Sequence, residues 1–125
     1  MRESSAGIMY SKELLNHFQN PRNAGELLAP TATAQVQNPA CGDVLQLSLK
    51  LAAGKITAAR FRAKGCVAAI ACGSLLTEML QGLTPEQARG LKREEVVARL
   101  GGLPPESMHA SHLAIDALSA VLAKL

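Results

Sequence analysis

Aromatic side chains are almost absent from this sequence of 125 residues, which contains no Trp, one Tyr and two Phe. Proteins that bind single-stranded nucleic acid stack the bases on aromatic side chains, so this scarcity argues against such a platform. Neither sign of charge predominates, because the formal net charge is only +3, and no long run of Lys or Arg occurs. The sequence therefore predicts no nucleic-acid partner.

Long hydrophobic runs are also missing. The longest uncharged apolar-rich stretch, residues 65–77, is too short to span a bilayer. Residues 1–5 lead into no apolar signal core. We therefore expect a cytoplasmic protein without membrane association. In that compartment, the three cysteines suggest metal or thiol chemistry rather than disulfides.

Apolar residues suffice for one buried core, since 48% of the chain is hydrophobic. A chain of this length is expected to form one domain. No internal repeat, low-complexity tract or linker divides the sequence. Residues 1–9 carry no pattern and are expected to form a flexible tail, so the single domain comprises residues 10–125.

Three segments have the pattern of β-strands. Residues 31–37 contain Thr and Val, which favour the extended form. Residues 45–51 alternate Leu with polar side chains, which predicts a strand with one buried face. After a short turn at residues 52–54, residues 56–63 return with Arg60 and Arg62 on the face opposite Phe61. The last two segments therefore predict a hairpin with a polar outer side.

Helical periodicity takes over after residue 64, and residues 67–81 form the clearest predicted helix. A shorter helix is expected after Ser11, and another between Thr84 and Gly90, where Thr84 caps the first turn. Two more are predicted at residues 92–100 and from residues 107–109 to the C-terminus. The last of these should pack its apolar residues inward, namely Ala114, Leu118, Val121, Leu122 and Leu125.

A thiol and a carboxylate stand two residues apart in Cys41-Gly42-Asp43. In an extended segment, residues i and i+2 point to the same side, so both side chains can face one ion. Gly42 between them allows the backbone to bend sharply. The alternative is a turn with a small buried cysteine, which this motif alone does not exclude.

The other two cysteines lie in different settings. Cys72 falls on the apolar stripe of the helix at residues 67–81 and is most simply a core residue. Cys66 stands at the start of that helix, where free backbone N–H groups and the helix dipole favour a thiolate. Six residues separate them, about 120° around a helix, so they should not share a ligand site.

His109, at or near the start of the last helix, completes a set of potential ligands with Cys41, Asp43 and Cys66. Two thiolates, one imidazole and one carboxylate suit tetrahedral zinc, and mixed ligation also occurs around iron–sulfur clusters. A hydrogen-bonding role at a helix end is the alternative for His109. For His17, in the first helix, a surface or hydrogen-bonding role is expected in preference to metal ligation.

Several separated motifs carry a resemblance to a known family over almost the whole chain from Tyr10 onward. They are, in order, Tyr10-Ser11, His17, Asn20-Pro21-Arg22-Asn23, Pro39-Ala40-Cys41-Gly42-Asp43, Gly65-Cys66, Ala69-Ile70-Ala71, Thr77-Glu78, Leu103-Pro104-Pro105 and His109. The chain resembles the iron–sulfur cluster assembly scaffold family of the IscU or NifU N-terminal type. The resemblance implies an α+β fold of the IscU/SufE-like kind, with a three-stranded antiparallel sheet packed by about five helices.

The same resemblance implies a scaffold or carrier and not an enzyme. Such proteins receive sulfur from a cysteine desulfurase, combine it with iron and pass a [2Fe–2S] cluster to apo iron–sulfur proteins. Matched position by position, Cys41, Asp43, Cys66 and His109 fall on the family's ligands for the cluster or zinc. The expected cargo is therefore a transient [2Fe–2S] cluster, or Zn²⁺ or Fe²⁺.

The sequence departs from the family pattern at two places. A third cysteine, both a cluster ligand and an acceptor of persulfide sulfur, directly follows the histidine in the family, and this chain has Ala110 there. Impaired cluster assembly is therefore one expectation. Glu106 and Ser107 stand where the family carries an apolar residue and a lysine, which leaves recognition by a DnaK-type chaperone doubtful.

Two other functions stay open at this point. The chain could accept persulfide sulfur on Cys41 or Cys66 without assembling a cluster, or bind zinc as a partner of a cysteine desulfurase. It could also be a degenerate homologue that only binds partners and holds no metal.

Overall fold

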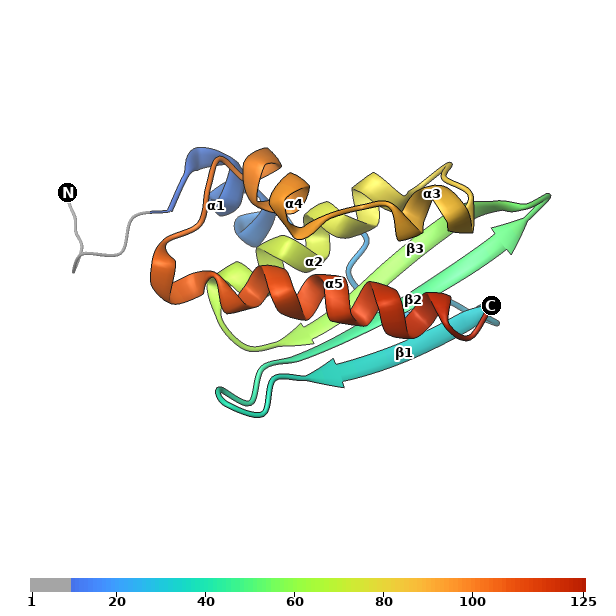
Figure 1. The fold of residues 1–125 in the computed structure, drawn as a ribbon, viewed down its shortest axis with the longest axis horizontal. Coiled ribbons are helices and arrows are strands. Elements are labelled where there is room, and N and C mark those ends of the chain that lie inside the picture. The colour runs from blue at the N-terminus through green and yellow to red at the C-terminus, as the bar shows by residue number, and fades with distance from the viewer. Residues whose placement is uncertain (1–9) are drawn as a thin grey trace.

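The structure is a computed structural model that describes residues 10–125, so the predicted tail at residues 1–9 lies outside the described residues. The elements in chain order are α1 (Lys12–Gln19), β1 (Ala32–Gln37), β2 (Val44–Ala52), β3 (Lys55–Lys64), α2 (Val67–Leu80), α3 (Pro85–Arg89), α4 (Arg93–Arg99), η1 (Pro105–Ser107) and α5 (His109–Leu122). The predicted α+β fold with a three-stranded sheet and five α-helices is confirmed for this part of the chain (Figure 1). None of the described helices combines the length and hydrophobicity needed to cross a membrane.

The three strands form one antiparallel sheet in the order β1-β2-β3. The predicted hairpin between β2 and β3 turns through Ala53 and Gly54, which both have positive φ (53° and 78°). Two consecutive residues with positive φ give the turn a twist that matches the strands it joins. The hairpin also fixes the register, which places Leu47 opposite Phe61 and Gln46 opposite Arg62.

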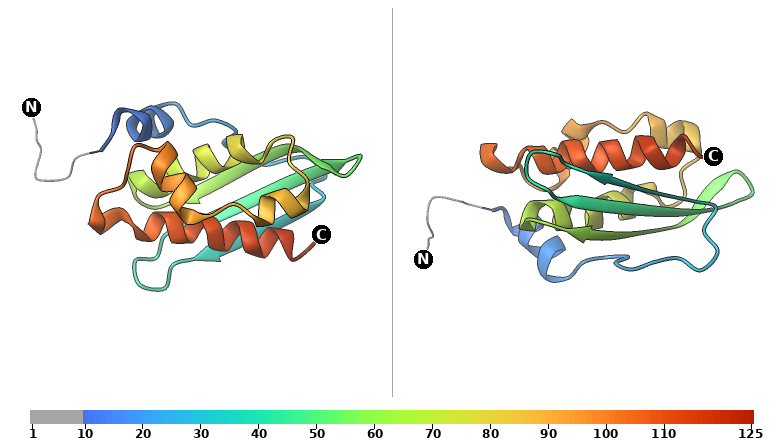
Figure 2. Two further views of the ribbon diagram at one scale, coloured as in Figure 1. Left: turned by 45° about the horizontal axis from the view of Figure 1, so that its top comes forward. Right: turned by 90° about the horizontal axis from the view of Figure 1, so that it is seen from below.

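One face of the sheet carries the core. The inward residues of β2, Leu45, Leu47 and Leu49, are at most 1% exposed, because α2 and α5 cover them (Figures 1 and 2). Helix α2 runs through the middle of the molecule, and ten of its residues are buried. Alternation along β2 thus separates a buried Leu face from a polar one, as its sequence predicts.

Close packing of α2 against the sheet depends on Gly73. A Cβ atom there would lie 2.6 Å from Cδ2 of Phe61, so only glycine allows this approach. The inward packing predicted for the last helix holds for four of its five named residues. It is wrong for Leu125, which is 41% exposed because α5 ends at Leu122.

A buried hydrogen-bond network joins α1 to α2. The side chain of His17 is 8% exposed, and its Nδ1 lies 2.7 Å from Oγ of Ser74. The same hydroxyl accepts a bond from the backbone N–H of Arg22, and Nε2 of His17 lies 3.4 Å from a carboxylate oxygen of Glu78. Of the two roles expected for His17, hydrogen bonding is confirmed, and a surface position is wrong because the residue is buried between α1 and α2.

Burial of His17 should make stability depend on pH. Burial, assisted by the charge of Arg22, lowers the pKa of His17 below its ordinary 6.5, although Glu78 acts in the opposite direction. Below pH 6.5 the unfolded chain therefore binds a proton more readily than the folded one. We expect the free energy of unfolding of the metal-free protein to fall as pH drops below 6.5, by at most about 1.4 kcal/mol per pH unit from this group.

Urea denaturation between pH 8 and pH 5 measures this slope. His17→Gln should flatten it, while His112→Gln, which changes an exposed histidine on α5, should leave it unchanged. Equal slopes in all three proteins would contradict the assignment to His17.

Candidate metal centre

The loop between β1 and β2 is shaped by its own hydrogen bonds. Oδ1 of Asn38 accepts bonds from the backbone N–H groups of Ala40 and Cys41, at 2.9 and 3.4 Å. The backbone of Asn38 closes the loop by bonding to Gly42 and Asp43. Gly42 has φ of +80°, which confirms the sharp bend predicted for it. This conformation leaves Cys41 exposed at the loop while Asp43 turns inward, 8% exposed.

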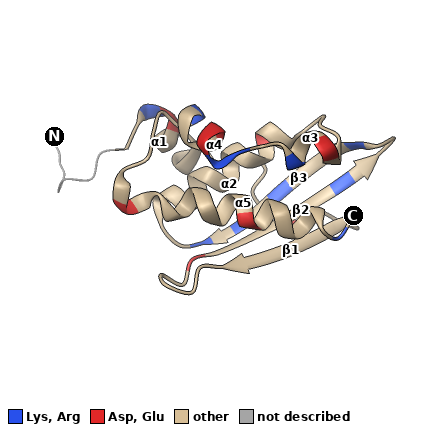
Figure 3. Ribbon diagram, in the orientation of Figure 1, with Lys and Arg blue, Asp and Glu red and all other residues tan. Residues whose placement is uncertain are grey.

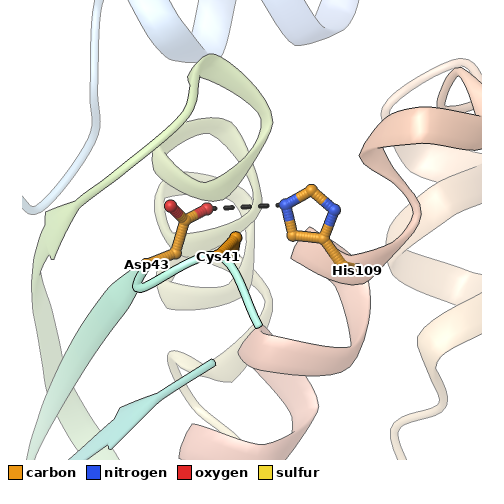
Figure 4. A group of neighbouring side chains, drawn as sticks. All are labelled: Cys41, Asp43 and His109. Carbon is orange, nitrogen blue, oxygen red and sulfur yellow. Dashed lines mark ion pairs between the residues drawn. The ribbon is translucent and has the colours of Figure 1, made fainter. Parts of the chain in front are cut away.

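Three of the four predicted ligands meet in space. The ligand atoms of Cys41, Asp43 and His109 all lie within 4.8 Å of one another. Figure 4 shows the Asp43 carboxylate facing the imidazole of His109, with Oδ2 and Nε2 3.5 Å apart. The loop before β2 and the first turn of α5 thus meet at one end of the sheet (Figure 1).

Cys66 lies beside this trio, although it is not among the three mutually close ligand atoms. Its Sγ is 3.8 Å from Nε2 of His109, and its backbone N–H points at Oδ2 of Asp43 over 3.5 Å. Four tetrahedral donors around zinc at 2.0–2.3 Å stand about 3.5 Å apart. The distances from His109 to Asp43 and Cys66 therefore already match those of a shared metal ion.

Cys66 caps α2, as its sequence position predicts. Its Sγ accepts a hydrogen bond from the backbone N–H of Ala69 at 3.4 Å, which lowers the pKa of the thiol. Burial and the nearby Asp43 carboxylate outweigh this bond and raise the pKa above its ordinary value. The prediction that the helix start favours a thiolate is thus wrong for the metal-free site. A bound cation would reverse this balance, because its charge favours the deprotonated thiol.

Gly65 makes room for the Asp43 carboxylate. A Cβ atom at residue 65 would lie 2.5 Å from Cγ and Oδ1 of Asp43, closer than side-chain carbons approach other atoms. The carboxylate therefore rests directly on the glycine backbone. Gly65 belongs to the Gly65-Cys66 motif, but its role could not be predicted from the sequence. Its contact with Asp43 joins residues that are 22 positions apart.

Gly65→Ala should consequently displace Asp43 from the site. We expect the affinity for zinc to fall by about 10–100-fold, the range found when groups that orient metal ligands are changed. Isothermal titration with Zn²⁺ measures the change. Gly82→Ala is the matched control, because Gly82 also has positive φ (86°) but a Cβ there meets nothing within 4 Å. Equal affinities in the two variants would contradict this role for Gly65.

Two other residues, Cys72 and Ala110, lie outside the candidate metal centre. Cys72 is fully buried in α2, and burial raises the pKa of its thiol to about 12, which confirms a core role. Ala110 is 1% exposed and belongs to the hydrophobic core. A residue next to His109 in sequence therefore packs into the core.

The chemistry of the site follows from its donors. Exposed and half-buried thiols, a carboxylate and an imidazole converge at the meeting point of one loop and two helix starts. Such a soft, mixed donor set suits zinc or iron bound with sulfide. The fold and the site together define a small α+β domain with a candidate metal centre at one end of its sheet.

Sequence comparison places this domain in a family. The family described as NifU-like N terminal domain matches residues 9–125, and the chain belongs to this family. It is 44% identical over 110 residues to iron–sulfur cluster assembly scaffold protein IscU 1 of Archaeoglobus fulgidus, covering 88% of this chain and 72% of the relative. It is 42% identical to the scaffold protein IscU of Azotobacter vinelandii, covering 92% of both chains.

Solved structures share the fold. A candidate iron–sulfur cluster assembly scaffold protein for the SUF system from Fervidobacterium islandicum superposes with a TM-score of 0.74 at 17% identity, covering 90% of this chain and 96% of that one. A NifU-like protein (N-terminal) from Brucella abortus gives a TM-score of 0.61 at 24% identity, covering 91% and 82%. These matches confirm the IscU/NifU-like fold predicted from the sequence motifs.

Proposed function

We propose that this protein is an iron–sulfur cluster assembly scaffold that holds a labile [2Fe–2S] cluster at Cys41, Asp43, Cys66 and His109. The observation that carries the proposal is the convergence of ligand atoms from Cys41, Asp43 and His109 within 4.8 Å. Membership of the NifU-like family and the scaffold names of its relatives support the same function. In this role the protein is a carrier that binds its cargo and releases it, and not an enzyme.

The cluster is cargo, and each ligand has a distinct task. Cys66 and His109 lie at the starts of α2 and α5 and would fix one side of the cargo. Cys41 lies on the exposed loop and would meet incoming sulfur and iron first. Without sulfide, the same four donors would hold Zn²⁺ or Fe²⁺, which need no reducing step.

The exposure of Cys41 would allow a sulfur donor and a cluster acceptor to reach the site. A cysteine desulfurase would present a persulfide to the site, and the Cys41 thiolate would attack its outer sulfur. That sulfur forms a new S–S bond to Cys41, while the desulfurase cysteine leaves as a thiolate. Apo iron–sulfur proteins would be the recipients.

Anaerobic reconstitution tests the function. Incubation with ferrous iron, cysteine, a cysteine desulfurase and a dithiol reductant, which supplies the electrons that convert persulfide sulfur to sulfide, should produce the visible absorption of a [2Fe–2S] cluster. The cluster should then move to an apo-ferredoxin. Cys41→Ala should abolish both signals, and Cys72→Ala should retain them. A protein that binds zinc tightly but never gains the absorption would contradict the proposal.

Asp43 should set how readily the cluster leaves. A carboxylate is a harder ligand than a thiolate and holds cluster iron less tightly. Asp43→Ala should therefore extend the lifetime of the assembled cluster and slow its transfer to apo-ferredoxin several-fold. Circular dichroism of the acceptor follows the transfer. Faster transfer from the variant would identify Asp43 as a retaining ligand instead.

A second candidate function rests on Ala110. Because alanine supplies no thiolate at the position of the third family cysteine, the exposed Cys41 thiol could serve as a sulfur acceptor alone. In that case mass spectrometry after incubation with desulfurase and cysteine would find added sulfur on Cys41 without iron uptake. Stoichiometric iron together with sulfide would favour the scaffold.

A further inference from the structure

The open face of the sheet concentrates the protein's positive charge. The chain has 13 Lys and Arg and 10 Asp and Glu. Of these, residues 32–64 contain five cations and one acid, Asp43, which turns into the metal centre. The rest of the chain has eight cations and nine acids. The whole surplus of positive charge therefore lies on the sheet, as Figure 3 shows along β2 and β3.

Four of these cations stand on the face that no helix covers. Arg60, Arg62 and Lys64 occupy alternate positions of β3 and are all exposed, as is Lys50 on β2. Alternate residues of a strand lie about 6.6–6.8 Å apart on one face, so the three side chains of β3 form a straight row. The right-hand view of Figure 2 looks onto these strands, with α2 and α5 behind and beside them.

Neutral hydrogen-bonding residues flank the row. The register sets Gln46 opposite Arg62, with Gln35 opposite Gln46 one strand further. Ser48, opposite Arg60, is buried and accepts a hydrogen bond from the Thr33 hydroxyl. A hollow of about 430 Å³ opens here, lined by Gln35, Val44, Gln46, Arg62, Ala63 and Lys64. Among the described residues, the one acid paired with the row is Glu26, which binds Arg62 at 2.8 Å.

The row ends at the metal centre. Lys64 is opposite Val44, the residue after Asp43, and precedes Cys66 by two positions. A molecule bound along β3 would therefore lie next to the candidate cluster. We propose that this cationic sheet face, formed by Lys50, Arg60, Arg62 and Lys64, docks a protein partner that presents a row of carboxylates.

Carboxylates fit this face better than nucleic acid does. The strands expose no aromatic side chain for base stacking, because Phe61 is 3% exposed and faces the core. Arg60 and Arg62 offer bidentate donors for carboxylates on another protein, and Gln46 opposite Arg62 offers a neutral donor. Complementary charge of this kind steers the approach of a partner and is screened by salt.

Binding of a defined acidic probe tests the proposal. Fluorescein-labelled poly-L-glutamate of 20 residues is titrated with the protein at low ionic strength, and labelled oligo-dT of 20 nucleotides is the competing probe. Lys50→Gln/Arg60→Gln removes two charges from the face. Arg89→Gln/Arg99→Gln removes two exposed charges from α3 and α4 and is the matched control.

We expect the face variant to bind polyglutamate about 5–10-fold more weakly and the control variant to change by less than about 2-fold. Amide chemical shifts of the native protein should move on β1, β2 and β3. Zinc binding should be unchanged in both variants, so the result is independent of the metal centre. Equal losses in the two variants, shifts confined to the helices, tighter binding of oligo-dT or no binding at low salt would each overturn the proposal.

Discussion

Cys66→Ala should lower the affinity of the protein for zinc by at least about 100-fold. Cys66 supplies one of two thiolates, and its Sγ lies 3.8 Å from Nε2 of His109. Removing it leaves one thiolate, one imidazole and one carboxylate, a set that cannot complete a closed tetrahedral site. Because metal binding contributes directly to folding free energy, the zinc-dependent rise in melting temperature should disappear as well.

Cys72→Ala is the control that separates ligation from packing. Cys72 lies in the same helix but is fully buried and is not among the ligand atoms that lie close to one another. Its truncation should cost about 1–2 kcal/mol of stability through a small cavity and should leave zinc stoichiometry unchanged. Metal analysis and competition with a chromophoric chelator measure both variants. Full zinc affinity in Cys66→Ala would remove this residue from the proposed ligand set.

The architecture could be predicted from the sequence, because the spacing of apolar residues indicates which face of each helix or strand is buried. The alternating Leu residues of β2 and the 3.6-residue period of α2 each follow from one buried face. The hairpin and the capped start of α3 were equally readable, since Thr84 and Gln87 form the predicted reciprocal cap. The limits of each helix agree with the prediction to within about two residues, except at the C-terminus. There α5 stops before Leu125, whose side chain reaches no partner in the core.

The site was less readable from sequence alone. The ligands meet because the loop before β2, the start of α2 and the start of α5 contact one another. No local sequence pattern encodes contacts between segments so far apart in the chain. The residue types and positions indicated the four candidate ligands, the family motifs supported them, and the structure adds the positions of Gly65 and Asn38. It also reverses the expected state of the Cys66 thiol, because a helix-end effect of a few hydrogen bonds is smaller than burial beside a carboxylate.

Ala110 is the position where sequence and structure together make the sharpest prediction. The sequence pattern predicts that a cysteine there costs little stability, because residue 110 lies outside the Leu118, Val121 and Leu122 stripe. That expectation is wrong: the Ala110 side chain is 1% exposed and belongs to the core. Ala110→Cys should therefore lower the stability of the metal-free protein by about 1–3 kcal/mol, as overpacking of a core does.

The same substitution should nevertheless improve cluster assembly. A thiol next to His109 would bring the thiolates near the site from two to three, closer to the ligation most clusters use. To reach the cargo, the first turn of α5 has to rotate the new side chain out of the core, and cluster binding would stabilise that rotated state. We expect a several-fold higher yield of reconstituted [2Fe–2S], and protection of the added thiol from iodoacetamide when the cluster is present.

Ala114→Cys is the matched control, because it adds a thiol to the same helix at a fully buried position one turn away from the site. If both variants reconstitute no better than the parent, α5 holds its register and residue 110 serves the core alone.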